Sequence, residues 1–262
     1  MSRASCAFFL FSALLGWLWT PYDPLALDLR ARLQAPGAAH WLGTDEYGRD
    51  VLSRLMAAAR TSVTISALTV SFAVAFGIVL GALSGYARGW IDRVIMLLTD
   101  TLLAFPSILL ALALLSILGA NIWGVILALG LAYMPTVTRV VRGAVMSLRE
   151  QEFIEASRLM GHPARYTLRA HVIPNCLAPV IVIATSMFGS VLLTESALSF
   201  LGLGVPPPAP TWGNMLAGAR PYMSQASWLG IFPGLCIALT LLGINLFGDY
   251  VRDRFDPRMK GL

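Results

Sequence analysis

The chain has 262 residues, of which 57% are hydrophobic and only 13% are charged, whereas soluble proteins carry about 25% charged residues. We therefore expect an integral membrane protein, in which the net charge of +5 reflects arginines between apolar segments and not a nucleic-acid surface. The single lysine, Lys260, lies near the C-terminus, which excludes a phosphate-binding Gly-Lys-Ser/Thr loop and an ATPase of that type.

Six apolar segments are candidates for crossing a bilayer, which takes about 20 residues. The first, residues 6–20, is short and could be a helix that is retained or a signal peptide. The retained helix is favoured because no small-residue cleavage site is evident before Pro21. The other five are predicted at 63–86, 91–118, 122–141, 172–201 and 228–250. The predicted fold class is all-α, a single polytopic domain over 1–262 with about six transmembrane helices.

Residues 21–60 are polar and contain several helix breakers, so we predict an irregular segment outside the membrane. Within it, Thr44 or Asp45 can cap a following turn, and Gly48 permits a left-handed backbone conformation. Asp50 and Arg54 are four residues apart and are expected to pair at a helix start. The residues that stand out are Gly43, Thr44, Asp45, Gly48, Arg49 and Asp50.

The second predicted span contains Gly77, Gly81 and Gly85, one every four residues on the same helix face. Small residues at this spacing let two helices approach closely in lipid. We therefore predict that this face packs tightly against another span.

Two carboxylates lie within predicted spans, where a charge is expensive and often functional. Asp100 follows Arg93 by about two helical turns, so a snorkelling or inter-helix ion pair near the cytoplasmic face is favoured over a proton relay. Glu195 is expected near the outer end of the fifth span, where it could line a pathway, seal a gate or pair with a partner subunit. Both are candidate pathway or gate residues.

The most polar stretch between the apolar segments runs from Glu155 to Pro174. Residues 149–160 favour a helix with one apolar stripe, and Gly161 is expected to end it. Pro163 suits the first turn of a second helix, which Pro174 is expected to disturb. The pattern predicts a helix, a bend and a second helix on one side of the membrane; an ordinary amphipathic interfacial helix is the alternative.

This stretch resembles the cytoplasmic EAA loop of ABC importer permeases, which reads Glu-Ala-Ala, three residues, Gly, nine residues, then Ile-x-Leu-Pro. Glu155, Ala156, Gly161 and Pro174 fall on that spacing, and Ser157 replaces the second Ala. Three other segments, residues 43–54, 194–213 and 245–258, resemble the dipeptide, oligopeptide and nickel branch of the same family. The resemblance covers nearly the whole chain.

The resemblance implies a type I ABC importer permease whose loop docks on an ATPase as a coupling helix. The implied coupling residues are Glu155, Ala156, Ser157, Met160, Gly161 and Pro174. The implied partners are a second homologous permease, two ATPase subunits and an extracytoplasmic substrate-binding protein. ATP and Mg²⁺ would bind to the ATPases, and this chain would be a non-catalytic subunit that holds no cofactor or metal.

The implied location is the bacterial inner membrane. If the loop after the fourth span is cytoplasmic, most of the arginines lie on that side, with both termini. The expected organisation is a short first helix at 1–20, an extracytoplasmic segment at 21–60, a five-helix core at 61–251 with the coupling loop at 143–171, and a cytoplasmic tail at 252–262.

The substrate class expected from the resemblance is short peptides, with chelated nickel, another small metal chelate or a glutathione-like peptide as the alternative. A secondary transporter is less favoured, because the sequence shows no convincing internal repeat. An intramembrane enzyme is also less favoured, because the sequence has neither Gly-x-Ser-x-Gly nor His-Glu-x-x-His and no histidine in mid-span.

Overall fold

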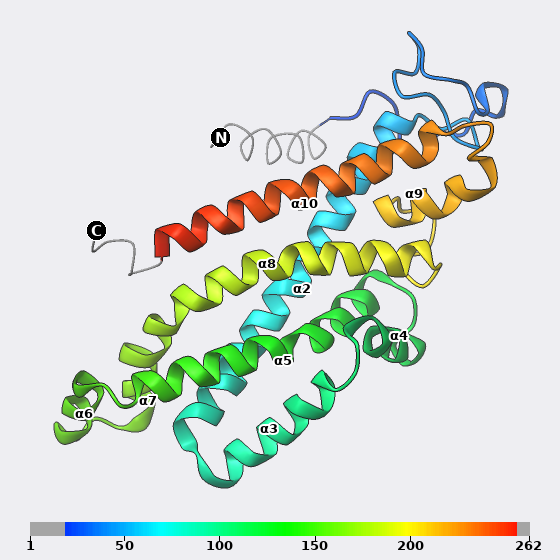
Figure 1. Cartoon of the computed structure of the whole chain (residues 1–262). Helices are drawn as coiled ribbons and strands as arrows, with labels where there is room; N and C mark the ends of the chain where they lie inside the picture. The colour runs from blue at the N-terminus through cyan, green and yellow to red at the C-terminus, as the bar shows by residue number, and fades with distance from the viewer. Residues whose placement is uncertain (1–18, 256–262) are drawn as a thin grey trace.

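The computed structural model describes residues 19–255, and every regular element in that range is helical (Figure 1). The helices are α2 (Val51–Ala87), α3 (Gly89–Leu103), α4 (Ser107–Leu118), α5 (Ile122–Leu148), α6 (Glu152–Leu159), α7 (Ala164–Thr167), α8 (Ile173–Phe200), α9 (Trp212–Ala219) and α10 (Trp228–Phe255). Short 3-10 turns occur at η1 (Leu29–Ala31) and η3 (Arg220–Tyr222), and η2 (Leu168–Val172) is a π-helix. The all-α fold class is confirmed.

Four helices among the described residues are long and apolar enough to cross a membrane: α2, α5, the continuous helix Ala164–Phe200, and α10. A fifth span results if α3 and α4 are counted together, since they form a pair bent by 98°. The predicted first span, residues 6–20, lies almost entirely outside the described residues, so six spans remain a prediction.

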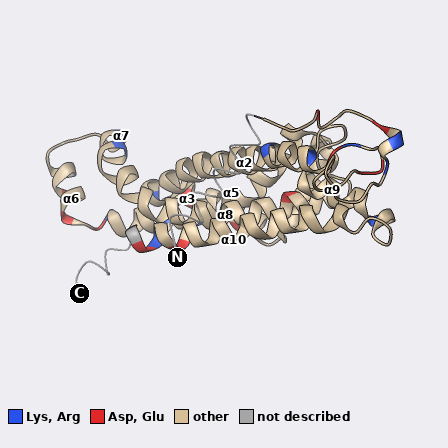
Figure 2. Ribbon diagram, turned by 90° about the horizontal axis from the view of Figure 1, so that it is seen from above, with Lys and Arg blue, Asp and Glu red and all other residues tan. Residues whose placement is uncertain are grey.

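The long helices form an elongated bundle in which α3, α5, α8 and α10 run side by side and α2 crosses behind them (Figure 1). The short helices α6 and α7 lie at one end, and α9 lies at the other end with residues 19–50. Charged residues gather toward these two ends, and most of the ribbon between them is uncharged (Figure 2). This distribution fits a bundle whose middle part lies in hydrocarbon.

The glycine face predicted for the second span packs on α5, as expected. A side-chain carbon added at Gly77 would lie 2.5 Å from Val137 Cβ, and one at Gly81 would lie 2.6 Å from the Thr138 carbonyl oxygen. Real side-chain carbons do not approach that closely, so only glycine permits this separation of the two helices. The contact between α2 and α5 is the most extensive between any two helices described.

Two predicted loop regions contain helix. Residues 51–60, predicted as part of the irregular segment, form the first turns of α2. The helix start expected at Asp50 is present, because the Asp50 carboxylate caps the helix by accepting the Ser53 N–H at 2.8 Å. The region 202–227 contains α9, where Thr211 and Asn214 form a reciprocal capping box. In both cases a side chain supplies the hydrogen bond that starts the helix.

The second helix of the polar loop is distorted just before Pro174, as predicted, but it does not end there. Helix α7 continues through the π-helix η2 into α8, and Pro174 sits in the first turn of α8. The wider π turn gives room for the proline ring, and Asn175 Nδ2 donates to the His171 carbonyl oxygen at 2.6 Å. The polar loop is therefore joined to a membrane span by unbroken helix.

Candidate functional site

The polar loop folds as a helix, a bend and a second helix, as the sequence predicts. The first helix is α6, which a short turn at 149–151 separates from α5. Gly161 has a φ of 78°, in the left-handed region that favours glycine, and the second helix begins directly after Pro163. The bend folds α7 back toward α6 at one end of the bundle (Figure 1).

Helix α6 and the residue after it present an apolar outer face that is largely exposed in the described part of the chain. This face consists of Phe153, Ala156, Leu159 and Met160, with exposed fractions of 83% for Leu159 and 68% for Met160. A short helix with such large exposed apolar side chains has the character of an interaction surface. Two of these four positions, Phe153 and Leu159, lie outside the coupling set expected from the sequence, in which Met160 is the only large apolar residue of the face.

Ser157 lies on the opposite, inner face of α6. It is fully buried, and its hydroxyl lies 3.1 Å from Thr167 Oγ1 on α7. The resemblance implied that Ala156 and Ser157 would both belong to the coupling surface. The structure instead places Ala156 outward and uses Ser157, with the buried Ile154, to join α6 to α7. Glu155 is exposed beside the outer face.

A row of rings connects the two halves of the loop. The rings of His162 and Tyr166 are 4.4 Å apart, those of Tyr166 and His171 are 5.8 Å apart, and those of His171 and Phe153 are 6.3 Å apart. These contacts tie α6 to α7 and η2. The loop is therefore a packed unit and not a free segment.

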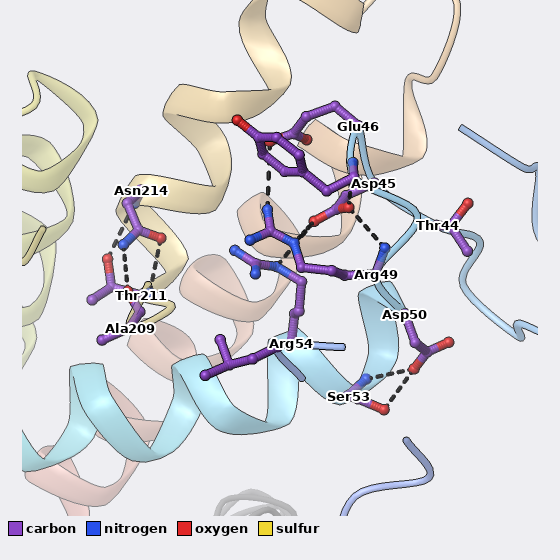
Figure 3. A network of polar contacts seen from close by, with 12 residues as sticks. Thr44, Asp45, Glu46, Arg49, Asp50, Ser53, Arg54, Ala209, Thr211 and Asn214 are labelled. Atoms are coloured by element: carbon purple, nitrogen blue, oxygen red, sulfur yellow. Dashed lines mark hydrogen bonds and ion pairs between the residues drawn. The ribbon is translucent and has the colours of Figure 1, made fainter. Parts of the chain in front are cut away.

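At the opposite end of the bundle, Asp45 is the centre of a network of charged side chains (Figure 3). One of its carboxylate oxygens accepts the N–H groups of Tyr47 and Arg49, each at 2.9 Å. The other lies 2.7 Å from Arg49 Nε and 3.3 Å from Arg54 Nε. The prediction that Asp45 caps a turn is confirmed.

Asp50 does not pair with Arg54, contrary to the prediction. Its carboxylate accepts from the N–H and the hydroxyl of Ser53 (Figure 3), and its other oxygen lies 2.9 Å from His40 Nδ1. Both carboxylate oxygens of Asp50 have other hydrogen-bond partners, and Arg54 forms its ion pair with Asp45 instead.

The glycines and Thr44 hold the outer segment in place. Gly43 and Gly48 have φ values of 78° and 74°, and a side-chain carbon at Gly48 would overlap the Asp28 carbonyl. The Thr44 hydroxyl donates to the Ala31 carbonyl, and the Thr44 carbonyl accepts from Trp228 Nε1 at 3.3 Å. These residues act as structural elements of the outer end.

A small cavity of about 30 Å³ lies beside this network, lined in part by Glu46, Arg54 and Asn214. Arg54 is buried, and its Nη1 has no hydrogen-bond partner. A volume of this size holds one or two waters. Burial raises the pKa of Glu46 above its usual value, against the lowering effect of nearby backbone N–H groups and arginines.

Asp100 forms an ion pair between two helices, which is one of the two arrangements expected from the sequence. Arg139 Nη2 on α5 lies 2.6 Å from Asp100 Oδ1 on α3. Arg93 is on the same helix as Asp100, whereas α5 brings Arg139 alongside from a distant part of the sequence. Both side chains of the pair remain more than half exposed.

Glu195 is fully buried, with no exposed atom that could meet a solute or a partner in this conformation. Ser199 Oγ donates to Glu195 Oε1 at 2.8 Å, and the hydroxyls of Ser62 on α2 and Thr211 at the start of α9 lie close by. The carboxyl group therefore sits where α2, α8 and α9 meet, in a structural position.

Comparisons with known proteins agree with this architecture. The family described as "Binding-protein-dependent transport system inner membrane component" matches residues 77–261. A dipeptide transport system permease protein, DppC, of Alkalihalophilus pseudofirmus is 45% identical over 229 residues, which cover 87% of this chain and 75% of that protein. A putative peptide permease of Brucella suis is 41% identical over 251 residues, covering 95% and 83%.

Solved structures show the same fold. A chain of the inward-facing MetNI methionine ABC transporter aligns with a TM-score of 0.62 at 16% identity, covering 75% of this chain and 93% of that one. A chain of an amino acid ABC transporter gives 0.56 at 14% identity, covering 74% and 90%. The predicted type I ABC importer permease fold is confirmed. The extent of the family match, together with these relatives, shows that the chain belongs to the family of binding-protein-dependent transport system inner membrane components.

Proposed function

We propose that this chain is a translocation subunit of an ATP-driven importer of short peptides, and that partner ATPases drive it through the polar loop. The peptide substrate class rests on the relatives, which are named as dipeptide and peptide permeases. The chain itself performs no bond chemistry in this role. Its task is to present a pathway and to change which side of the membrane the pathway opens to.

The observation that carries the proposal is the uncovered apolar face of α6. Burying a Leu or Met side chain stabilises a contact by about 1.5–3 kcal/mol, and Leu159 and Met160 are both largely exposed here. The loop lies at the end of the bundle, where a cytoplasmic partner could reach it (Figure 2). The occupant we propose is an ATPase subunit that binds ATP and Mg²⁺.

The loop is connected to a membrane span in a way that can transmit movement. Ser157 and Thr167 join α6 to α7, and α7 runs without a break into the span α8. A displacement of α6 therefore reaches α8 through helix and not through a flexible linker. In this mechanism Glu155, Ala156 and Met160 meet the ATPase, Gly161 sets the angle of the bend, and Pro174 sits where the loop joins the membrane.

The complete importer would contain a second homologous permease, two ATPases and an extracytoplasmic binding protein that delivers the peptide. We place the polar loop and both termini in the cytoplasm and residues 21–50, with α9, on the outer side. The excess of arginine on the loop side supports this orientation.

The test is reconstitution of the chain with its candidate partner permease and ATPases in liposomes. We expect peptide uptake that requires ATP and the binding protein. Replacing Leu159 and Met160 by Glu removes about 3–6 kcal/mol of apolar contact, so the ATPases should no longer co-purify. Leu27→Glu is the control, because Leu27 is also exposed, at 66%, but lies at the opposite end of the bundle from the loop (Figure 1). This variant should still co-purify with the ATPases. ATP-independent uptake by the chain alone would refute the proposal.

A further inference from the structure

A band of polar side chains crosses the exposed side of the bundle over three neighbouring helices. It begins on α3, crosses α5 and ends on α8. Its members are exposed or only partly buried, although all lie in helices that belong to candidate spans. We call this set the polar band: Asp100, Tyr133, Thr136, Arg139, Ser190 and Thr194.

The band is continuous from helix to helix. On α5, Tyr133, Thr136 and Arg139 are spaced three residues apart, so they form one slanted row on the helix surface. At one end of the row, Arg139 pairs with Asp100 at 2.6 Å. At the other end, the Tyr133 hydroxyl lies 2.8 Å from Thr194 Oγ1 and donates to the Ser190 carbonyl oxygen at 3.3 Å.

The charged pair lies within the candidate spans and not in the loops between them. Arg139 is nine residues before the end of α5 at Leu148, which places it roughly 14 Å along the helix from that end at 1.5 Å per residue. The two side chains are nevertheless 56% and 55% exposed. Charges at this depth are expensive in lipid and face the bundle interior or water instead.

The surface of α10 provides a contrast. The large hydrophobic side chains that this helix exposes up to residue 246 are aliphatic, as expected for contact with lipid: Ile231, Leu235, Leu239, Leu242 and Leu246. Asn245 is the exposed amide among them. On α5, the positions that follow Arg139 on its exposed side are Gly143 and Ser147, and Gly143 has nothing within 4 Å of a side-chain carbon. The side of α5 that carries the band is therefore polar and uncovered.

We propose that the polar band lines a water-filled permeation pathway and that Asp100 and Arg139 bind the two charged ends of a zwitterionic solute such as a free short peptide. This proposal rests on the proposed function and names a binding site within it. A solute with one ammonium and one carboxylate group can replace the internal ion pair without leaving either protein charge unpaired. Asp100 would receive the ammonium group, and Arg139 would receive the carboxylate.

The hydroxyl groups at the other end of the band extend this site. Tyr133, Thr136 and Thr194 can donate to or accept from a peptide bond, so they suit an uncharged middle part of the solute. The band therefore offers opposite charges at one end and neutral hydrogen-bonding groups along the rest. Such a surface favours short peptides over bare cations.

The first test is thiol labelling in the assembled complex, with the native cysteines replaced by serine. Thr136→Cys and the control Leu239→Cys are treated with a positively charged methanethiosulfonate, which reacts with thiolates in water. We expect Thr136→Cys to react at least about tenfold faster than Leu239→Cys, with or without ATP. Equal, slow reaction of both in every nucleotide state would show a dry contact with the second permease and would overturn the proposal.

The second test is uptake of alanyl-alanine by complexes that carry Arg139→Gln or Asp100→Asn. A hydrogen bond to a charged group is worth about a tenfold change or more, so each substitution should lower uptake by at least that factor. Co-purification of the ATPases with each variant shows that folding and assembly are intact. Wild-type uptake by both variants would refute the binding site, whereas failure of the unaltered chain to assemble with ATPases would refute the proposed function instead.

Discussion

Replacing Asp45 by Asn should destabilise the outer end of the protein far more than an ordinary surface substitution. The new amide can still accept the two backbone N–H groups, but it places an NH₂ group opposite Arg49 and Arg54. The Arg54 side chain is only 9% exposed, so it cannot recover its interaction with water. Breaking a buried charge pair in this way costs about 3–5 kcal/mol.

The assay is the rate at which an added protease cleaves the outer segment in native membranes. When opening is fast and reversible, this rate follows the free energy of local unfolding. A loss of 3–5 kcal/mol should raise it by roughly 10²-fold to 10³-fold or more. Asp23→Asn is the control, because Asp23 is exposed and accepts one backbone N–H from Leu25; its effect should stay below about 1 kcal/mol.

A double variant tests whether the loss of stability comes from the unpaired charge of Arg54. Asp45→Asn combined with Arg54→Met removes the unpaired buried charge, so it should recover much of the lost stability. A cleavage rate of Asp45→Asn within threefold of the control would refute this reasoning. So would a double variant whose loss equals the sum of the two single losses.

Three further predictions concern the packing, the loop and the pH response. Gly81→Leu should block the close approach of α2 and α5 and prevent complex assembly, because a side-chain carbon at Gly81 would lie 2.6 Å from the Thr138 carbonyl oxygen. Gly143→Ala should be tolerated, because nothing lies within 4 Å of that side-chain position; the yield of the membrane complex is the measurement. Gly161→Val forces a branched residue to a φ of 78°, and Glu155→Lys reverses a charge on the proposed ATPase contact. Each variant should insert into the membrane normally but lose coupling to ATP hydrolysis, so substrate uptake should fall; normal uptake would contradict this. Because burial raises the pKa of Glu46, the unfolded chain ionises at a lower pH than the folded one, and stability falls as the pH rises through this range. Glu46→Gln should therefore stabilise the outer segment against protease at pH 8, and its advantage should shrink toward pH 4.

The sequence was sufficient to predict features that depend on local pattern. The glycine face of α2, the bend at Gly161 and the turn at Asp45 were each predicted from spacing and from the conformational range of single residues. These features depend on neighbours within a few residues or on a repeat along one helix. The resemblance to the ABC permeases was predictable for the same reason, since its motifs are fixed spacings.

Partnerships between distant segments could not be predicted in the same way. The partner of Asp100 is Arg139 because α5 lies beside α3, and helix adjacency is not encoded in local spacing. Ser157 turned out to face α7 for the same reason. A signal for α9 was present in the spacing of Thr211 and Asn214, but the prolines nearby made the region look like a loop.

The central claim is that an ATPase subunit binds the outer face of α6. Photo-crosslinking in intact cells tests this claim most directly. A photoreactive amino acid at position 159 should form an adduct with an ATP-binding subunit, because Leu159 is the most exposed large apolar side chain of α6. The same group at position 27, at the other end of the protein, should form none with that subunit. An adduct between position 159 and an extracytoplasmic protein, or the absence of any adduct in cells that import the substrate, would contradict the account.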